Sequence, residues 1–366
     1  MELVFDIETD DLNATEIHCI VAIDENNKQY TFDIIDDNIL KGLDFLAEAD
    51  KLIGHNIIGF DIPVIKKLHG IDLWNKSKVV DTLVLSRLLN PVREKGHSLK
   101  VWGSKLGVAK DLPPEDFHIY TKDTLKYCIK DVVLNKLLFE YLKKESAGFS
   151  KESIDLEHQV TYILEEQKSN GFKIDIEFAT NLLSELNCKI KQVQDEVHTT
   201  FKPKWIDVKE VTPKLKQNNT LSKSGLTDYE YEDIQASGNM KPFMRKELVE
   251  FNLGSRKQIG EYLISFGWKP NKFTPTGQPI VDEGTLKNIT HIKEAKLIAD
   301  FLLYQKRIAQ ISSWLDSVED DDRVHGAVLS TGAITGRMAH RNPNMAQVPS
   351  VSSPYGKECR ACWIVD

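Results

Sequence analysis

The chain has 366 residues, of which 41% are hydrophobic and 28% are charged, the composition of an ordinary folded protein of two or three domains. Its net charge of −8 argues against indiscriminate nucleic-acid binding over the whole surface, and no apolar run of about 18 residues predicts a membrane span. The sequence starts directly with a strand pattern instead of a signal peptide, so we expect a cytoplasmic protein with no membrane partner.

The first predicted element is a strand that ends in two acidic residues. In MELVFDIET, apolar residues occupy the alternate positions Leu3, Phe5 and Ile7, as on a half-buried strand. Asp6 and Glu8 therefore share the opposite face. Two carboxylates at this spacing repel each other unless a divalent cation lies between them, and hard oxygen ligands suit Mg²⁺ or Mn²⁺. The end of this strand is a candidate metal site.

A second acidic segment, NIIGFD, covers residues 56–61 and leads into a helical pattern, DIPVIKKLHG. Pro63 suits the first turn of a helix, which places Asp61 at the start of that helix. We expect Asp61 to support a second metal ion through bound waters.

A third segment, DTLKYCIKDVVLNKLLFEYLKK, has apolar residues at intervals of three and four, which predicts a helix. Tyr127 and Asp131 are four positions apart and share one face of that helix. A phenol and a carboxylate one turn apart can both reach a metal-bound water. We expect Asp131 to complete the metal site and Tyr127 to orient the attacking water or relay its proton.

In type and order, the three segments resemble the motifs of the DEDD exonuclease superfamily, which has the ribonuclease-H-like fold. The resemblance is to its tyrosine branch, because the histidine variant has His five positions before the last aspartate, where this chain has Lys126. It implies two-metal 3′→5′ hydrolysis of phosphodiesters at single-stranded 3′ ends of DNA. It also implies DNA contacts by Asn56 and by Leu12, which would wedge against the terminal base or, alternatively, lie in the core. The implied catalytic residues are Asp6, Glu8, Asp61, Tyr127 and Asp131, and the four acids among them are the implied ligands of two Mg²⁺ ions.

After residue 148 the pattern becomes mainly helical. Two helices are predicted on either side of the turn at Asn170-Gly171, and residues 202–247 have no clear period, which indicates an exposed loop or linker. Further helices are predicted to open near Ser255, after Asp282 and along AKLIADFLLYQKRIAQISSWLDSV. We therefore expect two domains. They are an α/β ribonuclease-H-like exonuclease domain over 1–148, with a mixed sheet flanked by helices, and a mainly helical domain over 149–366.

The second half also resembles a known family. FNLGSRKQI, TPTGQPIVDEGTL, QKR and TGRMAHRNPNMAQVP look like the thumb and palm entry of family A DNA polymerases, in the form found in short-tailed, T-odd-type bacteriophages. The resemblance implies that Arg337, Asn344 and Gln347 contact primer-template DNA and that Lys306 and Arg307 grip the duplex backbone. The alternatives are a surface arginine beside a loop glycine for Arg337 and a solvated helix face for Lys306 and Arg307.

The chain departs from the family pattern near its end. The family's two palm aspartates and its lysine-bearing fingers helix have no counterpart, and Asp366 aligns before the first palm strand. We therefore expect the N-terminal part of a phage polymerase, which works in the cytoplasm of an infected bacterial host. It would hydrolyse DNA but polymerise only with a C-terminal partner fragment, and a processivity factor is a further candidate partner for residues 202–250.

Two other classes of protein remain open. One is a free-standing exoribonuclease of the same superfamily, against which the TGR and PNMAQVP segments argue. The other is a non-catalytic DNA-binding polymerase subunit, against which the complete set of acids argues.

Overall fold

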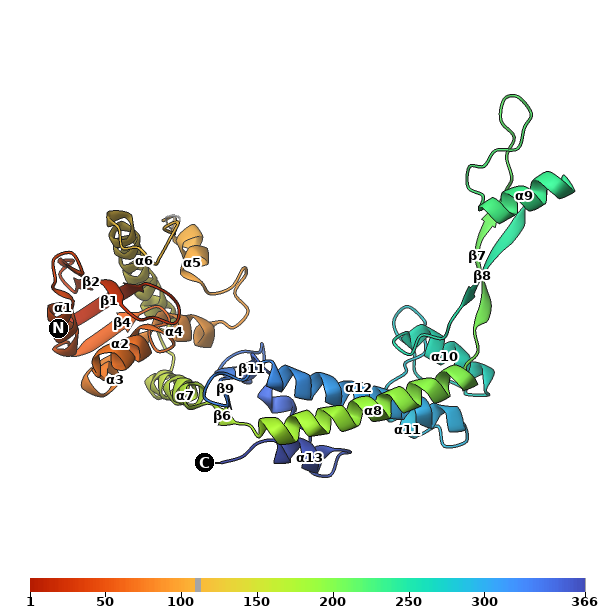
Figure 1. Ribbon diagram of the computed structural model, residues 1–366. Helices are drawn as coiled ribbons and strands as arrows, with labels where there is room; N and C mark the ends of the chain where they lie inside the picture. The colour runs from red at the N-terminus through yellow and green to blue at the C-terminus, as the bar shows by residue number, and fades with distance from the viewer. Residues whose placement is uncertain (109–112, 366) are drawn as a thin grey trace. The chain divides into compact units, whose positions relative to one another are not determined.

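The computed structural model, shown in Figure 1, describes residues 1–108 and 113–365, so the expectation about Asp366 lies outside the described residues. The chain forms two compact units. The first unit contains residues 1–174, 317–348 and the C-terminal residues from Trp363 onward, and the second contains residues 175–316 and 349–362. These boundaries differ from the predicted division at residue 148. The helix over Lys151–Asn170 belongs to the first unit because its His158 is buried against Asp81.

The first unit contains the predicted mixed sheet, which the described residues form from five strands in the order β3-β2-β1-β4-β5. β1 pairs antiparallel with β2, and β2 with β3, whereas β1, β4 and β5 run parallel. The strands are β1 (Glu2–Thr9), β2 (Ile17–Asp24), β3 (Gln29–Asp33), β4 (Lys51–Gly54) and β5 (Lys78–Asp81).

Helices flank this sheet on both faces. Leu3 and Phe5 of β1 belong to a hydrophobic cluster with α1 and α2, and Val4 belongs to a second cluster with α5 and α6. Leu3, Phe5 and Ile7 share one buried face, as the alternation predicts, whereas the expectation of a half-buried strand is wrong because Val4 is buried on the other face. The helices are α1 (Ile39–Ala47), α2 (Asp61–His69), α3 (Leu73–Lys76), α4 (Thr82–Leu89), α5 (Leu99–Leu106), α6 (Lys122–Glu145) and α7 (Lys151–Asn170).

The C-terminal part of the first unit is built from short elements. β10 packs against α7, which brings residues 317–348 onto the first unit. β6 pairs with β9 and β10 pairs with β11. These elements are β6 (Phe172–Lys173), β9 (Arg323–Val324), β10 (Ala327–Leu329), β11 (Ala339–Arg341) and the 3₁₀ helix η1 (Met345–Gln347).

The second unit is mainly helical, as predicted. Ser255 and Asp282 cap α10 and α11 through their side chains, because each accepts a hydrogen bond from a backbone N–H three residues on. The long helix α12 packs along α8. The helices are α8 (Ile176–Thr200), α9 (Asp228–Ser237), α10 (Arg256–Ser265), α11 (Glu283–Lys287), α12 (Lys293–Leu315) and α13 (Gly356–Ala361).

Residues 202–247 do not form the loop or linker that the sequence predicts. β7 (Lys204–Val211) and β8 (Phe243–Val249) form an antiparallel two-stranded ribbon, with α9 between them in the sequence. Trp205 and Leu248 face each other across the ribbon and are both exposed, so the ribbon has no buried face to produce an alternating pattern.

The two ends of this ribbon meet at one aromatic contact. The ring of Phe201, before β7, stacks on the ring of Phe251, after β8, with centroids 4.5 Å apart and planes within 13°. Both rings are buried in the core that α8, α10, α11 and α12 share. We call residues 202–250 the ribbon insert.

No helix in the described part of the chain combines the length and the apolar character that a membrane crossing requires.

Candidate active site

The three acidic segments meet at one cavity of about 920 Å³ in the first unit. It lies where β1 ends, beside the turn that precedes α2 and beside one face of α6. Its lining includes the predicted residues Asp6, Glu8, Leu12, Asn56, Asp61, Tyr127 and Asp131. Residues up to 125 positions apart in the sequence are therefore brought to one place.

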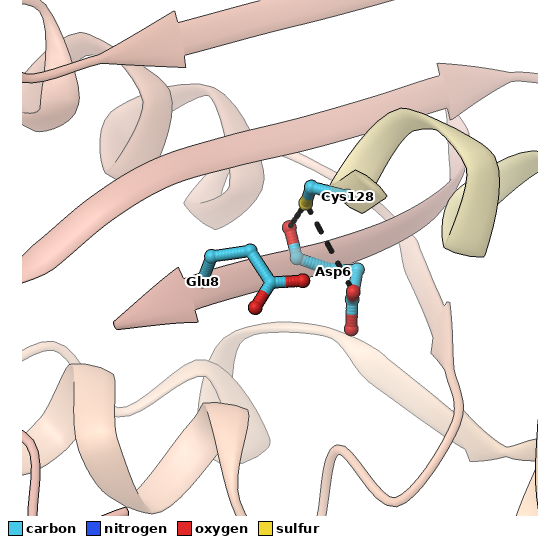
Figure 2. Close-up of side chains that lie close together, drawn as sticks. All are labelled: Asp6, Glu8 and Cys128. Atoms are coloured by element: carbon cyan, nitrogen blue, oxygen red, sulfur yellow. Dashed lines mark hydrogen bonds between the residues drawn. The ribbon is translucent and has the colours of Figure 1, made fainter. Parts of the chain in front are cut away.

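Asp6 and Glu8 lie close together on β1, beside Cys128 of α6, as Figure 2 shows. One carboxylate oxygen of each residue and the Cys128 sulfur all lie within 4.8 Å of one another. The Cys128 thiol is 3.6 Å from the Asp6 carbonyl oxygen and 3.9 Å from Asp6 Oδ2. Cys128 was not predicted, because in the sequence it is an ordinary apolar position of the α6 pattern.

The thiol of Cys128 lies within hydrogen-bonding distance of Asp6 as a weak donor. Burial raises the pKa of Cys128 well above its ordinary value, and the neighbouring Cys19, Asp6 and Glu8 raise it further. A neutral thiol donates weakly and binds hard cations poorly. The two carboxylates are therefore the candidate metal ligands in this group, and the Cys128 thiol donates toward Asp6.

Asp61 is a buried carboxylate on the same cavity, with 3% of its surface exposed. Its Oδ1 accepts a hydrogen bond from the backbone N–H of Ile7, at 3.2 Å, between Asp6 and Glu8. Burial raises the pKa of Asp61 to about 7, with a smaller contribution from Asp81. A divalent cation nearby would favour the ionised carboxylate, so this donor set of carboxylates fits Mg²⁺ or Mn²⁺.

Tyr127 and Asp131 line the cavity from the same face of α6, as the spacing of four predicts. Asp131 is buried, although it is not one of the three residues whose ligand atoms lie within 4.8 Å of one another. The ring of Phe117 meets the Tyr127 ring edge-on at 6.2 Å and lines the same cavity. Phe117 lies outside any periodic segment of the sequence, so no signal pointed to it.

Leu12 and Asn56 lie at the cavity in two different ways. Leu12 is 87% exposed, so the alternative that it lies in the core is wrong. Asn56 has a left-handed backbone with φ of 68°, a conformation that asparagine tolerates better than most residues. Its side-chain oxygen lies only 2.8 Å from where a Cβ would stand on Gly59, so a larger residue at position 59 would displace the Asn56 side chain.

The structure separates the two lysine-arginine neighbours on α12. Lys306 is exposed, as a contact with DNA requires. Arg307 is 5% exposed, and its guanidinium donates to the Pro354 carbonyl at 3.1 Å and to Gln310 at 2.8 Å. The prediction that Arg307 grips the DNA backbone is therefore wrong, because consecutive residues of a helix point about 100° apart and Arg307 faces the interior of the second unit.

Arg337, Asn344 and Gln347 lie in the first unit, and all three are exposed. Arg337 lies in the turn that precedes β11, and Asn344 caps η1 by accepting from the Ala346 N–H at 3.2 Å. None of the three is among the described residues that line the cavity. They are therefore candidates for a DNA contact outside this cavity.

Comparison with known proteins supports the second resemblance. The family model for DNA polymerase family A matches residues 229–366. The DNA-directed DNA polymerase of Escherichia phage T7 is 28% identical over 457 aligned residues, which cover 99% of this chain and 64% of that protein. The enzyme of Enterobacteria phage T3 is also 28% identical, with the same coverage.

A solved structure has a similar fold. The polymerase domain of Pol1 from M. smegmatis, in complex with DNA primer-template and dNTP, superimposes with a TM-score of 0.69 and 16% identity, over 100% of this chain and 55% of that chain. The fold of this chain is therefore similar to that of a DNA polymerase domain. In sequence, the chain is similar to the DNA-directed DNA polymerases of phages T7 and T3, and it spans 64% of their length.

Proposed function

We propose that the first unit is a metal-dependent 3′→5′ exonuclease that acts on DNA. The observation that carries the proposal is the single cavity lined by Asp6, Glu8, Asp61, Tyr127 and Asp131. The sheet order, with three antiparallel strands followed by two parallel ones, supports a ribonuclease-H-like assignment.

The four acids would hold two Mg²⁺ ions, for which Mn²⁺ is a substitute. Asp6 and Glu8 occupy alternate positions on one face of β1. The N–H of Ile7, which lies between them, donates a hydrogen bond to Asp61. Asp131 approaches from α6. When bound, such ions supply hydroxide from water at neutral pH and stabilise the charge on the departing 3′ oxygen.

Tyr127 and the mouth of the cavity would position the substrate. The Tyr127 phenol, one helical turn from Asp131, orients the attacking water or relays its proton. Leu12 presents an exposed apolar side chain that packs against the terminal base of a single-stranded 3′ end. Asn56 offers an amide to the same strand.

For the whole protein we propose DNA-directed DNA polymerisation with proofreading, during phage infection of a bacterial cell. The homology to phage polymerases supports this proposal. Exposed Arg337, Asn344 and Gln347 would contact primer-template DNA, and Lys306 would contact the duplex backbone. A processivity factor is a further candidate partner for the ribbon insert.

The nuclease proposal is tested with single-stranded DNA labelled at its 5′ end. We expect the label to remain on a ladder of products shortened from the 3′ end, with Mg²⁺ required and a chelator abolishing the reaction. The matched control is Asp6→Ala, which removes one ligand. An RNA strand of the same sequence separates a deoxyribonuclease from the exoribonuclease alternative. A rate for Asp6→Ala within about twofold of the unsubstituted chain would contradict the proposal.

A further inference from the structure

The carboxylate of Asp81, which the sequence did not single out, holds the turn that leads to Asp61. Asp81 is the last residue of β5, and its side chain is 1% exposed. Its Oδ1 accepts from the Asn56 N–H at 2.9 Å and its Oδ2 accepts from the Ile58 N–H at 3.1 Å. These two bonds fix the left-handed turn that orients Asn56 and starts α2 at Asp61.

Asp81 also fixes the beginning of α4. Its Oδ1 accepts from the N–H groups of Leu83 at 2.8 Å and Val84 at 3.4 Å, so it is the N-cap of that helix. Burial raises the pKa of Asp81, whereas the backbone N–H groups lower it. Four donors on one buried carboxylate make its position well determined.

Thr82, the next residue, connects this junction to α6. Its hydroxyl is fully buried and lies 2.7 Å from Asn135 Oδ1 and 2.9 Å from His55 Nδ1. Asn135 is one helical turn beyond Asp131. The dipeptide Asp81-Thr82 therefore contacts two of the three segments that supply the candidate metal ligands.

The backbone of Asp81 is in turn held by α7. The Asp81 N–H donates to His158 Nε2 at 2.9 Å, and His158 Nδ1 lies 2.8 Å from the Ile154 carbonyl. The ring therefore bridges the Asp81 amide and the Ile154 carbonyl through its two nitrogens. His158 is 4% exposed. A histidine on the helix that leads out of the nuclease core is thus two hydrogen bonds away from the turn that carries Asp61.

We propose that His158 and Asp81 are positioning residues of the metal site: His158 of α7 holds the Asp81 backbone, and the Asp81 carboxylate holds the Asn56–Asp61 turn in the geometry that binds the metal. This inference rests on the proposed nuclease function. Neither residue touches the substrate. Loosening either bond spreads the orientations of Asp61 and weakens metal binding.

The experiment compares two substitutions at one position. His158→Phe keeps a ring but removes the acceptor, whereas His158→Gln offers a carbonyl oxygen in its place. Mn²⁺ affinity is measured on the whole chain by isothermal titration calorimetry, and the Mg²⁺ concentration that half-saturates the nuclease is measured in parallel. Asp155→Asn is the matched control, because Asp155 lies on the same helix as His158 and its substitution breaks only the exposed ion pair with Lys78 of β5.

We expect His158→Phe to weaken Mn²⁺ binding and raise half-saturating Mg²⁺ by about 10-fold, as loss of an outer hydrogen-bond partner does at other metal sites. His158→Gln and Asp155→Asn are expected to stay within about twofold of the unsubstituted chain. A purely structural role would lower the folded fraction without moving either constant. Asp81→Asn, which turns an amide N–H toward backbone donors, is expected to act in the same direction as His158→Phe and provides a second variant.

Equal Mn²⁺ affinities for the unsubstituted chain, His158→Phe and Asp81→Asn would overturn the inference. That result differs from failure of the proposed function, in which the unsubstituted chain shows no Mg²⁺-dependent shortening of DNA whatever the Mn²⁺ affinities are.

Discussion

The carboxylate of Asp61 accepts a hydrogen bond from the backbone N–H of Ile7, the residue between Asp6 and Glu8. This bond of 3.2 Å joins the start of α2 to the end of β1. It therefore fixes one acid relative to the other two through the backbone. Without a cation, the same geometry keeps the Asp61 carboxyl buried, and this burial affects the free energy of unfolding.

The first prediction concerns that effect. The pKa of Asp61 in the folded chain is about 7, above the ordinary 3.8, so the folded chain keeps a proton that the unfolded chain has released. Its contribution to stability is therefore lost as pH rises from about 4 to 7 and stays lost above that. Asp61→Asn retains the acceptor for Ile7 and removes the charge. In chelator at pH 8, we expect the variant to be more stable in urea by up to about 4 kcal/mol, because each pKa unit corresponds to about 1.4 kcal/mol.

The same variant is expected to have no such advantage at pH 4, where Asp61 is protonated in the folded state. Saturating Mg²⁺ at pH 8 is expected to stabilise the unsubstituted chain more than the variant, because ligand binding to the folded state adds stability. A variant less stable than the unsubstituted chain in chelator at pH 8 would contradict the burial argument.

The second prediction ranks the residues of the cavity. Asp6→Ala and Asp131→Ala each remove a proposed ligand, so we expect the nuclease rate to fall by several orders of magnitude. Tyr127→Phe keeps the ring against Phe117 and removes only the hydroxyl, so we expect a loss of about 10- to 100-fold. Single-turnover rates on 5′-labelled DNA give the comparison. Equal losses for Tyr127→Phe and Asp131→Ala would show that the Tyr127 phenol does more than orient the attacking water.

The third prediction concerns Cys128. Because burial raises the pKa of its thiol, Cys128 is a neutral donor behind Asp6. We expect Cys128→Ser, which keeps a donor, to leave half-saturating Mg²⁺ within about threefold of the unsubstituted chain. The melting temperature is expected to fall, because a hydroxyl replaces a fully buried sulfur. A loss of metal affinity as large as that of Asp6→Ala would identify Cys128 as a ligand.

The fourth prediction uses neighbours on α12. Lys306→Ala removes an exposed charge, so we expect weaker DNA binding with a salt dependence that is shallower by about one ion, and an unchanged melting temperature. Arg307→Ala leaves the Pro354 carbonyl without its donor, so we expect a loss of about 2–3 kcal/mol of stability. Duplex binding at several salt concentrations and urea unfolding measure the two effects. The opposite assignment of the effects would return Arg307 to the DNA surface.

Local pattern was enough to predict the type of the most regular elements. The strand β1 and the spacing of four in α6 are both confirmed, since the apolar positions Leu3, Phe5 and Ile7 of β1 share one buried face and leave a periodic trace in the sequence. The convergence of Asp6, Asp61 and Asp131 on one cavity is not a local property. It was expected only because their order resembles a known family, and their catalytic roles stay predictions.

Other features left no trace that a pattern could show. The ribbon insert is exposed on both faces, so its strands have no period. The sequence around Arg307 does not differ from that around an exposed arginine on a helix. Only the packing of Arg307 against Pro354 shows that it is buried. Asp81 and His158 act through backbone hydrogen bonds between segments 77 residues apart, which no spacing rule detects.

The stacked rings of Phe201 and Phe251 close the ribbon insert at its base, where it joins the helical core of the second unit. The chain leaves the helical core at one ring and re-enters it at the other, 4.5 Å away, so almost fifty residues begin and end at the same point. Lengthening a segment closed at its base costs little entropy, provided that the contacts of Lys202 and Lys204 with the core residue Tyr262 are kept. Substitutions can therefore change the surface of this segment while the helices that hold its base keep their packing.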